Sequence, residues 1–163
     1  MKYFTIDLIK RYNNFDDDDI QRKSESEWDA IARKYWEEFE KYKDAFPKSF
    51  LKEYLKHGFH DYELKSIDIS IEKTRKNSSK EKAVVCISLY GGNKRKRAHR
   101  IKFRNVTHII SDLKFDNSFY LGYNLLYFEL HKTDSEYRAE ILFENGSELS
   151  LNFNKILSKV LLK

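Results

Sequence analysis

The hydrophobic periodicity of the chain changes once, near residue 64, from helical spacing to strict alternation. Before that point apolar residues recur every three or four positions, which places them on one side of a helix. After it they recur every second position, which places them on one face of a strand. Within 163 residues, about the length of one domain, this change predicts a single α+β domain with a helical part over 1–63 and a β-rich part over 64–163.

Three helices are expected in the first part. Thr5 can cap a short helix that ends near Asn13, and Ser24 with Glu27 has the spacing of a capping box for the second helix. The second helix carries one apolar stripe: Trp28, Ile31, Tyr35, Phe39, Tyr42 and Phe46.

The junction between the two parts also has recognisable signals. Pro47 must stop the second helix, because proline lacks the backbone N–H that a helix interior requires. Ser49 can cap a third helix, and Gly58 stands where a helix that ends in a left-handed residue needs it.

Alternating segments predict strands over residues 67–71, 85–89, 101–103, 120–130, 137–143 and 149–153. Asn145 and Gly146 are the strongest two-residue hairpin signal in the chain, so the strands on either side should pair antiparallel. Residues 106–110 fit one or two helical turns or a strand, and residues 156–161 are expected to form a closing helix. The fold prediction is three N-terminal helices packed on one face of an antiparallel sheet of about six strands.

Four short stretches carry a resemblance to a known family. They are the start Met1-Lys2-Tyr3-Phe4-Thr5, a helix with Glu and Trp that ends before Pro47, the pair His60-Asp61, and the closing hairpin at 140–148. In these the chain resembles a family of small bacterial proteins of unknown function, common in spore-forming Gram-positive genomes. Its sheet region is similar to that of single-domain immunity proteins from toxin systems. The resemblance implies lineage and fold, and it carries no established activity.

The charge of the chain is unevenly distributed. Residues 1–63 carry 12 Lys and Arg against 15 Asp and Glu, a net charge of −3, whereas residues 64–163 carry 19 against 11, a net charge of +8. Such a surface can steer a charged partner toward one end of the molecule.

Residues 94–104 concentrate the positive charge, with one histidine and no acid. The segment has seven basic residues: Lys94, Arg95, Lys96, Arg97, Arg100, Lys102 and Arg104. On a hairpin, the first four would project at the tip while the last three line one face of a strand. This predicts a row that contacts the phosphates of a nucleic acid, or alternatively a solvated edge that keeps sheets from pairing with one another.

A second candidate site lies around His57, His60 and Asp61, since imidazole and carboxylate groups can bind a divalent metal ion. A metal-dependent hydrolase is the hypothesis that follows. The alternative is that His60 and Asp61 organise the turn into the first strand through hydrogen bonds to the backbone.

The third candidate is a protein-binding surface on the second helix. Trp36 falls beside the apolar stripe, and Glu37 and Glu40 make the neighbouring side acidic. Aromatic residues are enriched at the energetic centres of protein interfaces.

The remaining composition favours an intracellular binding protein. Cys86 is the only cysteine, so no disulfide can form within the chain, and no segment has the roughly 18 consecutive apolar residues of a membrane span. No catalytic or cofactor motif has its required spacing, and no cofactor is expected. The leading hypothesis is a non-enzymatic cytoplasmic protein that binds another protein in an immunity-like or regulatory role, with nucleic-acid binding and metal-dependent hydrolysis as alternatives.

Overall fold

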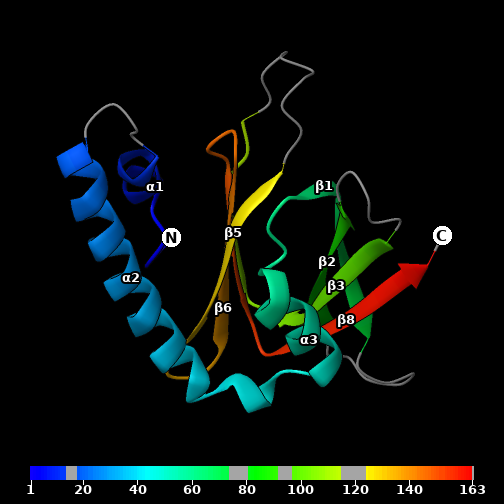
Figure 1. Ribbon diagram of the computed structural model, residues 1–163. Coiled ribbons are helices and arrows are strands. Elements are labelled where there is room, and N and C mark those ends of the chain that lie inside the picture. The colour runs from blue at the N-terminus through cyan, green and yellow to red at the C-terminus, as the bar shows by residue number, and fades with distance from the viewer. Residues whose placement is uncertain (14–17, 74–80, 92–96, 115–123, 163) are drawn as a thin grey trace.

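The computed structural model describes residues 1–13, 18–73, 81–91, 97–114 and 124–162. The helices come first: α1 (Ile6–Tyr12), α2 (Asp18–Glu40), the short 3-10 helix η1 (Lys43–Ala45) and α3 (Lys48–His57). Eight strands follow: β1 (Tyr62–Lys73), β2 (Glu81–Gly91), β3 (Arg97–Val106), β4 (His108–Asp112), β5 (Leu125–Lys132), β6 (Tyr137–Phe143), β7 (Glu148–Phe153) and β8 (Lys155–Leu162). The predicted α+β class, with three N-terminal helices and antiparallel strands, is confirmed (Figure 1).

The strands form two sheets instead of the single sheet of about six strands that the sequence predicted. Sheet A has the order β1-β2-β3-β8, sheet B has the order β4-β7-β6-β5, and all neighbours are antiparallel. The chain passes from sheet A to sheet B between β3 and β4, close to Asn105, which has a left-handed φ of 55°. It returns between β7 and β8 at Asn154, whose backbone N–H donates to Arg104. Alternation alone does not reveal this division, because the apolar pattern continues on both sides of each crossing.

Of the three predicted N-caps, one is confirmed and two are wrong. Thr5 caps α1, with its hydroxyl accepting from the backbone N–H of Leu8. Ser24 lies inside α2, where its hydroxyl donates to the carbonyl of Ile20, so the predicted capping box is wrong. The cap of α3 is Pro47 and not Ser49.

The tail forms β8 and not the predicted closing helix. Residues 155–162 pair over their whole length with residues 97–104 of β3, from Arg97 opposite Leu162 to Arg104 opposite Lys155. The short apolar run fits either state, and the free edge of β3 decides in favour of a strand because it offers a complete ladder of hydrogen bonds. The undecided segment near 106–110 is likewise a strand, β4.

Tyrosine hydroxyl groups attach the helices to the edge strand of sheet B. The Tyr54 hydroxyl donates to the carbonyl of Phe128 at 2.6 Å, and the Tyr42 hydroxyl donates to the carbonyl of Leu130 at 2.7 Å. The backbone N–H of Leu130 donates to the Tyr35 hydroxyl at 3.0 Å. β5 is at the edge of its sheet, so some of its backbone N–H and C=O groups point away from β6. The tyrosine hydroxyls form the hydrogen bonds that these groups would otherwise lack.

The core fills the space between the two sheets and under the helices. It is rich in aromatic rings; for example Phe103 of β3 and Phe153 of β7 meet edge to face with centroids 4.9 Å apart. Phe39 on α2 is fully buried among the rings of Tyr35, Phe46 and Tyr54. None of the helices in the described ranges is long and apolar enough to cross a membrane.

Gly58 ends α3 in the left-handed conformation that the sequence predicted, with a φ of 56°. No atom lies within 4 Å of the position that a Cβ would occupy, so the cost of a side chain there is purely that of the backbone conformation. We expect Gly58→Ala to lower the free energy of unfolding by about 1 kcal/mol and Gly58→Asn by less, because asparagine tolerates this conformation better. Urea denaturation measures both; equal losses for the two variants would contradict the account.

Candidate functional site

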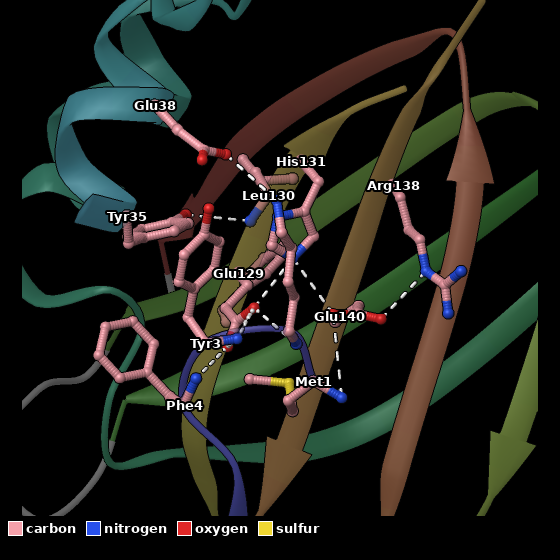
Figure 2. Close-up of polar contacts among 12 residues, drawn as sticks. Met1, Tyr3, Phe4, Tyr35, Glu38, Glu129, Leu130, His131, Arg138 and Glu140 are labelled. Atoms are coloured by element: carbon pink, nitrogen blue, oxygen red, sulfur yellow. Dashed lines mark hydrogen bonds and ion pairs between the residues drawn. The ribbon is translucent and has the colours of Figure 1, made fainter. Parts of the chain in front are cut away.

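The site begins with a buried carboxylate that holds the first residues of the chain. The backbone N–H groups of Lys2, Tyr3 and Phe4 all donate to Glu129 on β5, with the closest contact, from Phe4, at 2.6 Å (Figure 2). Glu129 is fully buried. Three successive amide donors compensate a negative charge that would otherwise be costly away from water.

Glu129 lies directly opposite Glu140 in the register of β5 and β6, and such a pair of like charges repels. His131 relieves the repulsion: its Nε2 is 2.9 Å from Glu129 and 3.2 Å from Glu140. Arg138 Nε lies 3.0 Å from the other oxygen of Glu140. We call Glu129, His131 and Glu140, together with the amides of residues 2–4, the N-terminal clasp.

The clasp shifts two pKa values in opposite directions. Burial alone would lower the pKa of His131, but its hydrogen bonds to the two glutamates raise the pKa above the ordinary value. Burial alone would raise the pKa of Glu140, but the hydrogen bond from His131 and the nearby positive charges lower it. Both shifts favour a protonated imidazole between two carboxylates.

The clasp is also the one group of three metal-ligating side chains within the part of the chain that the structure describes, with its ligand atoms within 4.8 Å of one another. Both oxygens of Glu129, however, already accept hydrogen bonds from amides. A metal ion at Nε2 of His131 would have to displace the proton that links the glutamates. The donor set therefore fits a structural role better than a metal centre.

The clasp places Phe4 in the wall of an aromatic pocket. The Phe4 ring stacks on Tyr127 of β5 with centroids 5.1 Å apart, and it also contacts the rings of Trp28 at 4.9 Å and Tyr35 at 5.7 Å, both on α2. Trp28 also contacts Tyr127 directly, at 5.2 Å. Three elements that are far apart in the sequence thus share one cluster of rings.

The pocket lies between α2, α3 and β5 and has a volume of about 360 Å³. This is within the range of sites that hold small molecules or side chains. Its lining residues are mostly apolar: Phe4, Trp28, Ala32, Tyr35, Trp36, Tyr54, Leu55, Lys56, Gly58, His60, Leu126, Tyr127 and Phe128. Trp36 and Leu55 on its rim are 41% and 52% exposed, whereas Tyr35 and Tyr54 are buried at its base.

The charged residues that line the pocket are all of one sign. Lys56 and His60 are its basic lining residues, and none of the residues that line it is acidic, although His60 pairs with Asp61 just outside the pocket. Burial raises the pKa of Tyr127 to about 12 and that of Tyr54 well above its ordinary value, so both hydroxyl groups are neutral at physiological pH. The pocket is therefore suited to an apolar group that carries a negative charge at its outer end.

The structure places the predicted protein-binding residues in different environments. Trp36 lies on the pocket rim, with its ring 6.1 Å from that of Tyr54. Glu37 and Glu40 are exposed on α2 outside the pocket, and Glu40 forms an ion pair with Lys43.

The predicted basic row is placed as expected but is not free of acidic partners. Arg100, Lys102 and Arg104 lie on one face of β3, opposite to the buried Phe103. Across β2, Lys102 and Arg104 both pair with Glu72, and Arg100 lies 3.9 Å from Asp68. Cys86, which is buried as predicted, lies between Asp68 and Lys102 in the strand register.

The other residues of the basic hairpin are outside the described ranges: Lys94, Arg95, Lys96 and the side chain of Arg97. Nucleic-acid binding by residues 94–104 therefore stays a prediction. The described half of the row has carboxylate neighbours that a phosphate would have to displace.

The predicted metal site is a turn between α3 and β1. His60 Nδ1 lies 2.7 Å from Asp61, the side chain of His57 is outside the described residues, and Phe59 and Asp61 both adopt left-handed φ values. The backbone N–H of Asp61 donates to Leu125 at the start of β5. These contacts support the turn-organising alternative, and hydrolysis at this place stays a prediction.

Sequence reasoning missed the clasp. Its signal is two ionisable residues two positions apart, Glu129 and His131, within a strand that is otherwise largely apolar. Alternation indicates that they share a face, but only the fold brings Glu140 and the first residues of the chain onto it.

Comparison with known proteins identifies no relative: no family model, curated protein or solved structure matches the chain. The resemblance to the bacterial family and to immunity proteins stays a prediction.

The clasp can be tested by removing one negative charge. Glu129→Gln keeps the size of the side chain but turns one acceptor oxygen into a donor that faces backbone N–H groups. We expect a loss of about 3 kcal/mol in the free energy of unfolding, typical of a broken buried ion pair. The exposed Glu144→Gln should change it by less than about 0.5 kcal/mol. A loss below about 1 kcal/mol for Glu129→Gln would contradict the proposed role of the clasp.

The pKa shifts also predict a pH dependence of stability. The raised pKa of His131 adds stability that is full below about pH 6.5 and is lost as pH rises through the folded-state value. The lowered pKa of Glu140 adds stability that is present above about pH 4.3 and is lost as pH falls through the folded-state value. We expect the difference in stability between wild type and His131→Gln to be largest between these limits, measured by urea denaturation across pH. A difference independent of pH would refute the protonated imidazole.

Proposed function

We propose that the chain is a non-enzymatic binding protein of the bacterial cytoplasm, which takes an apolar side chain of a protein partner into the aromatic pocket. The observation that carries the proposal is the pocket itself, with Trp36 and Leu55 exposed on its rim. Aromatic residues around a desolvated depression are typical of the energetic centre of a protein interface.

The rigidity of the pocket supports the same function. Its walls are joined by buried hydrogen bonds, since Tyr54 donates to β5 and also contacts the Tyr35 hydroxyl. The clasp fixes Phe4 on the other side. A preformed pocket loses little conformational entropy when it is filled, so one inserted side chain can contribute strongly to affinity.

The charges at the pocket indicate which partner would fit. Lys56 and His60 lie on it, and no acidic residue lines it. A partner that presents an aromatic or aliphatic residue beside a carboxylate would place that carboxylate near Lys56. An immunity-like or regulatory role, in which the protein occupies a surface of one cognate partner, agrees with this chemistry.

A pair of matched substitutions on α2 tests the proposal. Ala32 lines the pocket, whereas Ala30 is exposed two residues earlier and does not line it. Ala32→Phe should fill the pocket and weaken partner binding at least about tenfold, while Ala30→Phe, with the same change in volume and helix propensity, should leave it unchanged. The partner is first isolated from native cytoplasm by pull-down at physiological salt, with and without nuclease, and is then titrated by calorimetry.

Equal affinity of both variants would exclude the pocket as the binding site. Recovery of nucleic acid alone, released by nuclease or salt and lost when Arg100, Lys102 and Arg104 are changed to serine, would replace the proposal with the basic row.

The charge preference of the pocket can be measured without the partner. Trp28 and Trp36 are the two tryptophans of the chain and both line the pocket. An anionic aromatic dye, anilinonaphthalene sulfonate, should quench their fluorescence by energy transfer, and Lys56→Gln should weaken its binding several-fold. Ala32→Phe should abolish the transfer and Ala30→Phe should not. Binding of the dye to Ala32→Phe as tightly as to wild type would show that it binds elsewhere.

A further inference from the structure

Within the described ranges the two four-stranded sheets have four edge strands, and three of them are short or at least partly covered. The backbone of β5 is bonded to tyrosine hydroxyls from α2 and from α3 and to Tyr42, just after α2. β8 contacts α3, where the Ser49 hydroxyl donates to the carbonyl of Ser158 at 3.5 Å, so its edge is partly covered. β4 is only five residues long. Short or covered edges of this kind prevent a sheet from pairing with another sheet.

The fourth edge strand, β1, is different. It is 12 residues long, and its start is held against β5 by the bridge between Glu63 and Asn124. After the irregularity between Leu64 and Ser66 it leaves β5, and within the described ranges the one strand beside residues 66–73 is β2. Its outer edge thus offers a row of backbone donors and acceptors to another strand.

The same part of β1 exposes large apolar side chains. Ile69 and Ile71 are 62% and 65% exposed, and Ile67 beside them is half-buried against the core. Ile69 lies opposite Val85 and Ile71 opposite Ala83, so the three isoleucines continue the core face of sheet A beyond the core. An exposed apolar row along an unprotected edge is a typical pairing surface.

We propose that this edge binds the β1 strand of a second copy of the chain, antiparallel and about a two-fold axis at Ile69. The axis joins the two copies of sheet A into one continuous sheet. It also requires that residues of the same face lie opposite one another, because the pattern of faces is identical in both strands.

The sequence of β1 is self-complementary in this register. Ile69 lies opposite its own copy, Ile67 lies opposite Ile71, and every isoleucine of the row faces another. Moving the axis by one residue in either direction places Ile71 opposite Lys65 or Ile67 opposite Lys73. The register centred on Ile69 is therefore the one that matches all the apolar residues.

The charges on the opposite face of β1 permit this pairing. Asp68 would lie opposite Ser70, and Glu72 opposite Ser66, so no two carboxylates meet. Both carboxylates are already near cations of β3: Glu72 pairs with Lys102 and Arg104, and Asp68 is close to Arg100. A like-charge contact arises only between Lys65 and Lys73 at each end, where Lys65 has Glu63 as its own partner at 2.6 Å. The basic row of β3 thus has an intramolecular role, which is to neutralise the carboxylates of the edge strand β1.

The oligomeric state of the full chain tests the proposal, with a matched pair of variants. Ile69 and Ile110 are both 62% exposed, but Ile110 lies on the short edge strand β4. Sedimentation equilibrium in the micromolar range should give wild type and Ile110→Lys a mass of twice 19.7 kDa. Ile69→Lys places two lysines opposite one another and should sediment at 19.7 kDa with an unchanged circular dichroism spectrum.

Two outcomes would overturn the proposal. One is a monomeric wild type throughout this range, including the case in which the β1 edge captures a strand of another protein instead. The other is an Ile69→Lys variant that remains as dimeric as Ile110→Lys.

Cross-linking tests the register. Under mild oxidation Ile69→Cys should form a disulfide-linked dimer by itself, because the residue lies on the two-fold axis. Ile67→Cys and Ile71→Cys should cross-link when mixed and not when separate, and Ile110→Cys should stay monomeric on a denaturing gel. Cross-linking of Ile67→Cys or Ile71→Cys alone, as fast as Ile69→Cys, would show that the axis lies elsewhere.

Discussion

The hydrogen bonds to the buried carboxylate of Glu129 are the interaction on which the clasp and the aromatic pocket depend. The carboxylate is acceptable inside the protein only because three amides and His131 surround it. By satisfying this charge the segment at residues 2–4 is fixed to sheet B, and Phe4 is fixed against Trp28 and Tyr127. The polar clasp and the apolar pocket are therefore coupled. The buried charge must be satisfied by the amides of residues 2–4, and this fixes the position of Phe4 in the pocket.

The edge strands β5 and β1 differ in how far other parts of the chain cover them. Around β5, tyrosines of the helical region use their rings to fill the core and their hydroxyls to satisfy the edge, so the helices cannot slide along the sheet without losing hydrogen bonds. Along β1 beyond Ser66 no such cover exists among the described residues, and exposed isoleucines stand beside the open backbone. The proposed pocket and the proposed dimer edge thus occupy separate regions, so partner binding and self-association can be tested independently.

The charge asymmetry of the sequence has a different meaning once the strands are paired. The excess of positive charge after residue 63 includes Arg100, Lys102 and Arg104, which contact the carboxylates of Asp68 and Glu72 across β2. The electrostatic potential at the surface therefore cannot be inferred from a run of basic residues alone, because strand pairing places acidic residues from other parts of the sequence beside it. The ion pairs are partly exposed, so they contribute modestly to stability and mainly balance charge.

The sequence by itself determined the features that depend on neighbouring residues. The change of period predicted the α+β class, Thr5 and Gly58 predicted two helix boundaries, and Asn145 with Gly146 predicted the antiparallel pairing of β6 and β7, because caps and turns are set by local backbone chemistry. The turn itself has three residues, 144–146, and not the two of the predicted hairpin, since Phe143 pairs with Ser147. The place of Trp36 beside the apolar stripe is also a local property, but its role in protein binding stays a prediction. Only the tertiary structure decided the division into two sheets, the strand state of residues 155–162, the ion pairs of the basic row and the clasp of Glu129, His131 and Glu140. Each of these features depends on which strands from distant parts of the sequence pair with one another. Alternative pairings compete, and their relative energies cannot be predicted from a local sequence pattern.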